Sequence, residues 1–140
     1  MKVSASATVR SQHTNEEDTI ETIEMDVEGE DSGLLIGRRG ETLRALQFMV
    51  NLLVGRRVPG RVIIDVEGYR ERRYASLRTL AIRVAERVAA TGRSITLEPM
   101  PSNERRVIHM ALADHPGVAT ESEGAGDDRK ITVFPKRSNP

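Results

Sequence analysis

Apolar and polar residues alternate along the start of the chain in a way that predicts paired strands. Residues 3–9 and 23–27 place an apolar side chain at every second position, the period of a half-buried strand. The polar stretch Ser11–Asp18 between them suits the loop of a hairpin. The chain is therefore expected to open with two antiparallel strands.

Helical spacing replaces this alternation after Asp31. Residues 34–36, Leu-Leu-Ile, predict a short helix that runs into Gly37-Arg38-Arg39-Gly40. From Glu41 to Val54 apolar residues recur at i, i+3, i+7 and i+10, which predicts a helix whose core face holds Leu43, Leu46, Val50 and Leu53. Arg44, Gln47 and Asn51 lie toward its other face. Alternation returns at Arg61–Glu67 and predicts a third strand.

The second half of the chain has the pattern of another small unit. The predicted elements are a helix over about 70–91 that ends at Gly92, a short strand at 94–98, a helix from Ser102 as N-cap to about Ala113, and strands at 118–122 and 130–134. The loop 123–129 separates the last two strands. The natural boundary between the halves falls near Gly68.

These elements predict an α+β fold with two lobes. The first lobe reads strand-strand-helix-Gly loop-helix-strand, and the second reads helix-strand-helix-strand-strand. We expect residues 1–18 to form the first strand and polar loop, 19–68 the core of the first domain, 69–136 the second domain, and 137–140 a tail. Lobes of roughly 60 residues are marginal when isolated.

The net charge of zero hides a strong segregation of charge. Lys and Arg number 21, and so do Asp and Glu, among 140 residues. Residues 1–36 hold 2 basic and 9 acidic groups, residues 37–109 hold 15 and 7, and residues 110–140 hold 4 and 5. The middle section is therefore basic, with a net charge of +8, and has the charge distribution of a surface for polyanions.

Composition excludes several classes of site. The chain has no Cys, which removes disulfides, thiolate nucleophiles and Cys-ligated metal sites. No apolar run has the length of a membrane span or a signal peptide, so we expect a cytoplasmic protein without membrane insertion. The sequence has no Walker loop and no Gly-x-Ser-x-Gly turn. We therefore expect neither an enzyme, nor a metal site, nor a cofactor.

The Gly37-Arg38-Arg39-Gly40 turn is the most informative candidate site. Two glycines three residues apart let the backbone approach a ligand closely and expose amide donors at the start of the next helix. Arg38 and Arg39 add guanidinium donors for phosphate oxygens, with Ile36 and Arg44 on either side. This combination is typical of a clamp for single-stranded nucleic acid, although a GxxG alone is also found as a plain turn between helices.

A second candidate pair is Arg105 and His109. Four residues apart on a helix, their side chains project from one face and can grip neighbouring phosphates. The structural alternative is that His109 packs against the sheet and Arg105 pairs with an acid.

The two motifs together resemble a known family. The run Leu34 to Leu43 around the GxxG turn, continued by Ala45-Leu46-Gln47 and Val50-Asn51, resembles the KH domain of the bacterial Jag proteins (the KhpB or EloR type). The run Asn103 to Leu112 resembles the motif that names the R-3-H domain, and in this family the two domains follow in this order. The resemblance implies a bacterial-type (type II) KH-like lobe followed by an R-3-H lobe.

The resemblance also implies function. It implies binding of single-stranded RNA through Gly37, Arg38, Arg39 and Gly40 and through Arg105 and His109, with DNA left open as a ligand, and a post-transcriptional or RNA-chaperone role. The alternative is an adapter that forms a homodimer, or a heterodimer with a small KH protein, and regulates cell shape, elongation or division. A nuclease that uses His109 ranks third.

The sequence departs from the family at its start. Jag proteins typically carry a further N-terminal domain and a linker, and the bacterial-type KH fold has a leading helix, whereas this sequence starts almost at the first expected KH strand. Functions that depend on that further domain, including links to the membrane and division machinery, do not follow from the two matching motifs.

Overall fold

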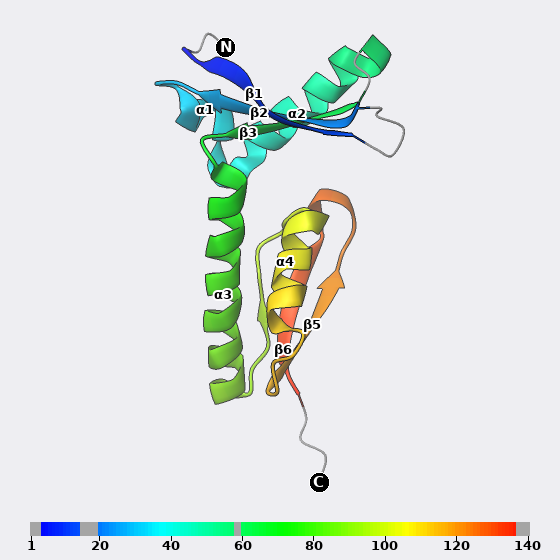
Figure 1. Cartoon of the computed structure of the whole chain (residues 1–140). Coiled ribbons are helices and arrows are strands. Elements are labelled where there is room, and N and C mark those ends of the chain that lie inside the picture. Colours follow the sequence, from blue (N-terminus) through cyan, green and yellow to red (C-terminus); the bar gives the residue numbers. More distant parts are fainter. Residues whose placement is uncertain (1–3, 15–19, 58–59, 137–140) are drawn as a thin grey trace. The chain divides into compact units, whose positions relative to one another are not determined.

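A computed structural model describes residues 4–14, 20–57 and 60–136 of the chain (Figure 1). The chain divides into two units, Met1–Arg72 and Arg73–Pro140. Both contain helices and a sheet, which confirms the predicted α+β class and the order of elements in each lobe. Within the described residues, no helix combines the length and apolar character that crossing a membrane requires.

The sheet of the first unit has the strand order β1-β2-β3. Strand β1 (Ser6–Thr14) runs antiparallel to β2 (Ile20–Glu28), which runs parallel to β3 (Arg61–Val66). A parallel pair needs a crossover connection. Here the crossover holds α1 (Ser32–Ile36), the short 3-10 turn η1 (Arg38–Gly40) and α2 (Glu41–Val54), which places the GxxG turn between two helices.

The core of the first unit forms where the helices cover one face of this sheet. Its buried apolar residues are Val27, Leu35, Leu43, Val62, Ile64 and Val66. Leu46 and Val50 pack partly buried against them, as the helical spacing predicts. Leu53 does not, because it lies 69% exposed near the end of α2, so its prediction as a core residue is wrong.

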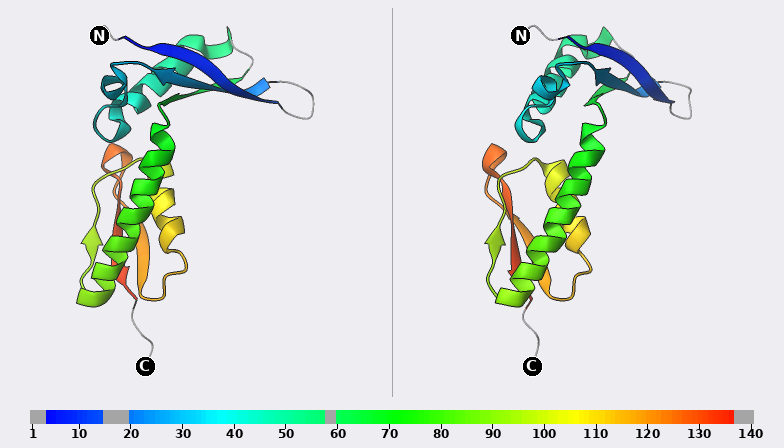
Figure 2. Two further views of the ribbon diagram at one scale, coloured as in Figure 1. Left: turned by 60° about the vertical axis from the view of Figure 1, so that its left-hand side comes forward. Right: turned by 90° about the vertical axis from the view of Figure 1, so that its left-hand side faces the viewer.

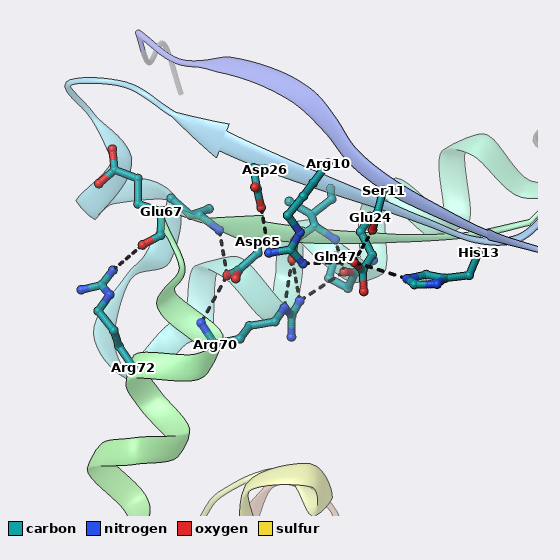
Figure 3. A network of polar contacts seen from close by, with 12 residues as sticks. Arg10, Ser11, His13, Glu24, Asp26, Gln47, Asp65, Glu67, Arg70 and Arg72 are labelled. Carbon is teal, nitrogen blue, oxygen red and sulfur yellow. Dashed lines mark hydrogen bonds and ion pairs between the residues drawn. The ribbon is translucent and has the colours of Figure 1, made fainter.

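The first hairpin differs from its prediction. Ser11 to Thr14 belong to β1, whereas the sequence pattern predicts them in the loop; residues 15–19 of that loop and Val3 lie outside the described residues. The register shifts at Arg10, an extra residue between the pairs Val9–Met25 and Ser11–Glu24. Polar residues extend this strand because cross-strand contacts hold them, including the Ser11 hydroxyl that donates to Glu24 at 2.6 Å (Figure 3).

The second unit packs two helices on a three-stranded antiparallel sheet (Figure 2). Its elements are α3 (Tyr69–Thr91, whose first turn belongs to the first unit), β4 (Ile95–Thr96), α4 (Ser102–Leu112), β5 (Val118–Glu123), the 3-10 turn η3 (Gly126–Asp128) and β6 (Lys130–Pro135). Strand β6 lies between β4 and β5. Leu77 and Val88 of α3 and Ile108 of α4 meet Ile131 and Val133 of β6 in the core.

Two local predictions in this unit are wrong. Strand β4 is shorter than the predicted 94–98: Ile95 and Thr96 pair with β6, and the Leu97 N–H donates to the Ile131 carbonyl oxygen at 2.9 Å without extending the strand. Ser102 is not the N-cap of α4. Pro101 takes that place with extended backbone, and its carbonyl accepts the Arg105 N–H to close the first turn. No side chain caps the helix, so the serine hydroxyl is not needed to begin it.

Candidate nucleic-acid interface

The backbone of the GxxG turn takes conformations that glycine favours. Gly37 has φ +71° and Gly40 has φ +75°. A Cβ on Gly37 would collide with the Thr42 side chain, and a Cβ on Gly40 would lie 2.6 Å from the Tyr69 ring. Neither position therefore accepts a larger residue without a shift of its neighbours.

Arg39 is held in the left-handed region as well, with φ +54° and ψ +30°. Few residues other than glycine adopt this conformation, and it costs roughly 1–2 kcal/mol. Arg44, one turn along α2, donates from Nη1 to the Arg39 carbonyl oxygen at 2.8 Å. Arg44 therefore stabilises the backbone of the turn. The sequence pattern suggests a contact of Arg44 with nucleic acid and does not reveal this structural role.

The GxxG turn carries a cationic hydrogen-bond donor, Arg38, beside the start of α2. Helix α2 begins after Gly40 without a side-chain cap, so the N–H groups of its first turn receive no side-chain acceptor at the cap. Arg38 is exposed, and its guanidinium makes no hydrogen bond or ion pair with the residues that the structure describes. The Glu41 N–H donates to the Arg38 carbonyl oxygen, so the exposed Arg38 guanidinium is the donor here that is available to phosphate.

The apolar neighbours of the turn differ in exposure. Leu34 is 57% exposed and Ile36 is partly buried against the core of the unit. Ile64 is 6% exposed, so its side chain belongs to the core and offers little surface to a base. Apolar surface beside the turn therefore comes from α1.

The second predicted pair lies on α4, where Arg105 and His109 are one turn apart. Arg105 donates from Nε to the Met100 carbonyl oxygen at 3.1 Å. No other hydrogen bond or ion pair joins its guanidinium to the described part of the chain. The expected alternative, in which Arg105 pairs with an acid, is not seen among these residues.

His109 packs against the edge strand β5. Its Nδ1 is hydrogen-bonded to the Thr120 hydroxyl at 2.6 Å and its Nε2 to the Ser122 hydroxyl at 2.9 Å. Partial burial, and then the neighbouring Arg105 cation, lower the pKa of the imidazole below its usual value of 6.5. The ring is therefore mostly neutral at neutral pH and has hydroxyl partners on both sides.

The sequence motifs did not identify Thr120 and Ser122 as partners of His109, although the pattern of β5 contains a signal for them. Both residues lie on the same face of β5 as the buried Val118, because side chains alternate along a strand. A strand that turns from an apolar to a hydroxyl residue on its core face needs a polar partner there. His109 is that partner.

The predicted sites thus form two clusters, one in each unit. Gly37, Arg38, Arg39 and Gly40 come together with Ile36 and Arg44 in the first. Arg105 and His109 lie together in the second. No group of three or more His, Asp or Glu side chains with the geometry of a metal site occurs among the described residues.

Comparison with known proteins assigns both units. Residues 2–66 match the family model "KhpA/KhpB, KH domain", and residues 75–135 match the model of the R-3-H domain. The chain is 43% identical over 124 residues to RNA-binding protein KhpB of Clostridium symbiosum, covering 87% of this chain and 56% of the relative. It is 41% identical over 121 residues to RNA-binding protein KhpB of Bacillus subtilis, covering 83% and 58%.

The chain spans somewhat more than half the length of these two relatives. The match covers both units in the order that the resemblance implied. The chain therefore contains a KhpA/KhpB-type KH domain followed by an R-3-H domain and is similar over both to the KhpB proteins.

Proposed function

We propose that this chain binds single-stranded RNA and acts as a post-transcriptional regulator. The observation that carries the proposal is the GxxG turn, which lies against Tyr69 and Thr42, accepts a hydrogen bond from Arg44, and carries an exposed Arg38 guanidinium without a hydrogen bond or ion pair to the described residues. The two relatives are RNA-binding proteins by name, which supports it. A cytoplasmic location, expected from the sequence, stays a prediction.

In this proposal the KH unit holds the RNA backbone at the turn. Phosphate oxygens accept from the Arg38 guanidinium, while bases lie over Leu34 and along α2. Arg105 of the R-3-H unit supplies a second phosphate contact. His109 reaches phosphate only if an imidazole N–H is released from Thr120 or Ser122, so Arg105 is the stronger candidate of the pair.

The test is a binding measurement with single-stranded RNA before and after Arg38→Asp combined with Arg39→Asp. Both residues lie in the turn and outside the core, so a native circular dichroism spectrum and melting temperature are expected. Affinity should fall by at least tenfold, because two cations become two anions beside phosphate. Unchanged affinity with a native fold would remove the turn from the interface.

A second function, as an adapter for another KH protein, is favoured by one observation. Helix α2 exposes four large apolar side chains that lie on one stripe of the helix, at i, i+1, i+4 and i+5: Phe48 (68% exposed), Met49 (48%), Leu52 (64%) and Leu53 (69%). Contiguous apolar surface of this kind commonly marks a protein-protein contact.

Size-exclusion chromatography with light scattering tests the adapter function. Phe48→Glu should abolish a dimer that forms without RNA, while Ile82→Glu, at an exposed apolar residue of α3, should leave it intact. A monomer at all concentrations, with and without a small KH protein, would remove the adapter function.

A further inference from the structure

The outer edge of β3 is closed by side chains. Strand β3 pairs with β2 on one side only, so the backbone groups of alternate residues on its other side lack strand partners. Gln47 donates from Nε2 to the Val62 carbonyl at 2.6 Å and accepts the Ile64 N–H on Oε1 at 2.7 Å. Arg70 donates to the Ile64 carbonyl from Nη2 at 2.8 Å and from Nε at 3.0 Å (Figure 3).

The carboxamide of Gln47 has the hydrogen-bonding pattern of a nucleobase edge. It is planar and presents one N–H donor and one oxygen acceptor side by side. The Watson–Crick edge of a base also presents a donor next to an acceptor, and proteins read unpaired RNA bases through this edge. Gln47 therefore occupies an acceptor and donor pair on β3 that would suit a base equally well.

This position lies along the path expected for bound RNA. Gln47 and Arg44 are one turn apart on the same face of α2, and Arg44 contacts the GxxG backbone. Gln47 lies seven positions after Gly40, which corresponds to about 10 Å along the helix. The side chains of Val62 and Ile64 are buried, so backbone groups are what this stretch of edge offers to a ligand.

We propose that Gln47 is an intramolecular stand-in for a nucleobase, which a base of the bound RNA displaces from Val62 O and Ile64 N. Arg70 keeps its two bonds to the Ile64 carbonyl during the exchange, and its Nη2 contact of 3.2 Å to Gln47 Oε1 passes to the incoming base. This inference rests on the RNA binding proposed above. It adds Gln47 as a residue that competes with RNA bases for the backbone groups of β3.

Displacement of Gln47 requires a base, because only a base can replace both of its hydrogen bonds to β3. A phosphate backbone alone offers no donor and acceptor pair in one plane, so it leaves the carboxamide in place. A base that remakes both bonds replaces the carboxamide without leaving Val62 O or Ile64 N unpaired, which would be costly. RNA with an abasic nucleotide at this position should therefore bind less tightly than intact RNA.

Nuclear magnetic resonance of the whole chain observes the exchange directly. During titration with single-stranded heptamers of A, C or U, the side-chain amide signals of Gln47 should move to the positions of an exposed glutamine such as Gln12. The Ile64 amide should stay protected from hydrogen exchange. If the Gly37 and Gly40 amides shift while the Gln47 signals stay at saturation, the inference is overturned and RNA binding stands. If no signal shifts with any heptamer, RNA binding itself fails.

A variant supplies the second measurement. Gln47→Met keeps the length of the side chain and removes the amide, so RNA should bind roughly three- to thirtyfold more tightly, as expected when two neutral hydrogen bonds no longer compete. Gln12→Met, at an exposed glutamine of β1, is the matched control and should bind as the wild type does. Equal or weaker binding by Gln47→Met, at an unchanged melting temperature, would contradict displacement. If this variant does not fold, the titration of the wild type still decides.

Discussion

Gly40 lies so close to the ring of Tyr69 that a Cβ at position 40 would stand 2.6 Å from Cε1. Gly40 ends the GxxG turn, and Tyr69 is the first residue of α3. The GxxG turn therefore packs against the first residue of α3 and is also bonded by Arg44. The shape of the candidate phosphate site depends on this contact.

Gly40→Ala should destabilise the KH unit by about 2–4 kcal/mol, because the left-handed backbone penalty adds to the overlap with Tyr69. Gly68→Ala is the matched control. Gly68 has a similar φ of +69° and no neighbour within 4 Å of the position that a Cβ would take, so only the backbone penalty of about 1 kcal/mol applies. Urea unfolding measures both variants. Equal losses of stability would show that the Tyr69 ring moves aside freely.

Arg38→Ala should weaken RNA binding with little change in stability, because Arg38 is exposed and bonded to no described residue. If its guanidinium neutralises one phosphate, the slope of log K against log salt should become less negative by about 0.7. Arg93→Ala, at an exposed arginine just after α3, is the control. A slope unchanged from wild type in Arg38→Ala would place Arg38 outside the interface.

Glu104→Gln should destabilise the R-3-H unit by about 2–4 kcal/mol, because removing one partner of a buried ion pair leaves the other charge uncompensated. Arg73 donates from Nε at 3.2 Å and from Nη2 at 3.0 Å to one oxygen of Glu104, and both side chains are largely removed from solvent. Glu86→Gln, at an exposed glutamate of α3, should change the free energy of unfolding by less than about 0.5 kcal/mol. Urea unfolding compares the two variants, and similar losses would argue against the pair.

His109 should give stability and RNA binding opposite dependences on pH. Its folded-state pKa lies below 6.5, so the unfolded chain binds the proton more readily than the folded chain does. The contribution of His109 to stability is present above pH 6.5 and is lost as the pH falls through the lower folded-state pKa. Urea unfolding should show this loss in the wild type and a flatter profile in His109→Gln.

RNA binding has the opposite sign if the imidazolium contacts phosphate. Phosphate favours the protonated ring, so affinity should rise as the pH falls. Affinity that stays constant between about pH 5.5 and 8, while stability falls, would assign His109 to the packing of β5 alone.

The parts of the fold that follow from local patterns were predictable. Helix α2 has the predicted bounds of 41–54, because its apolar spacing and flanking glycines are local signals. Leu53 fits the same spacing and is nevertheless exposed, because the core that the helix covers does not extend to its last turn. Periodicity identifies the apolar face of a helix. It does not show how many turns of that face are covered by the core.

The candidate site divides in the same way. The GxxG turn and the Arg105–His109 spacing are visible in the sequence as motifs. The contacts of Gln47 with β3 and of His109 with β5 join residues 11 to 17 positions apart, and they depend on which strand lies at the edge of each sheet. Strand order is a tertiary property, so residue patterns along the chain could not supply it.

The hydrogen bonds at the start of α3 determine where the chain can be truncated to give an intact KH unit. Asp65 Oδ1 accepts from the backbone N–H of Val66 at 2.9 Å and of Arg70 at 3.2 Å, which joins the end of β3 to the first turn of α3. The matched KH segment ends at residue 66, before Tyr69 and Arg70. A fragment trimmed there would lose both the ring that supports the GxxG turn and the guanidinium that closes the β3 edge. An autonomous KH fragment for ligand studies should extend through Arg72.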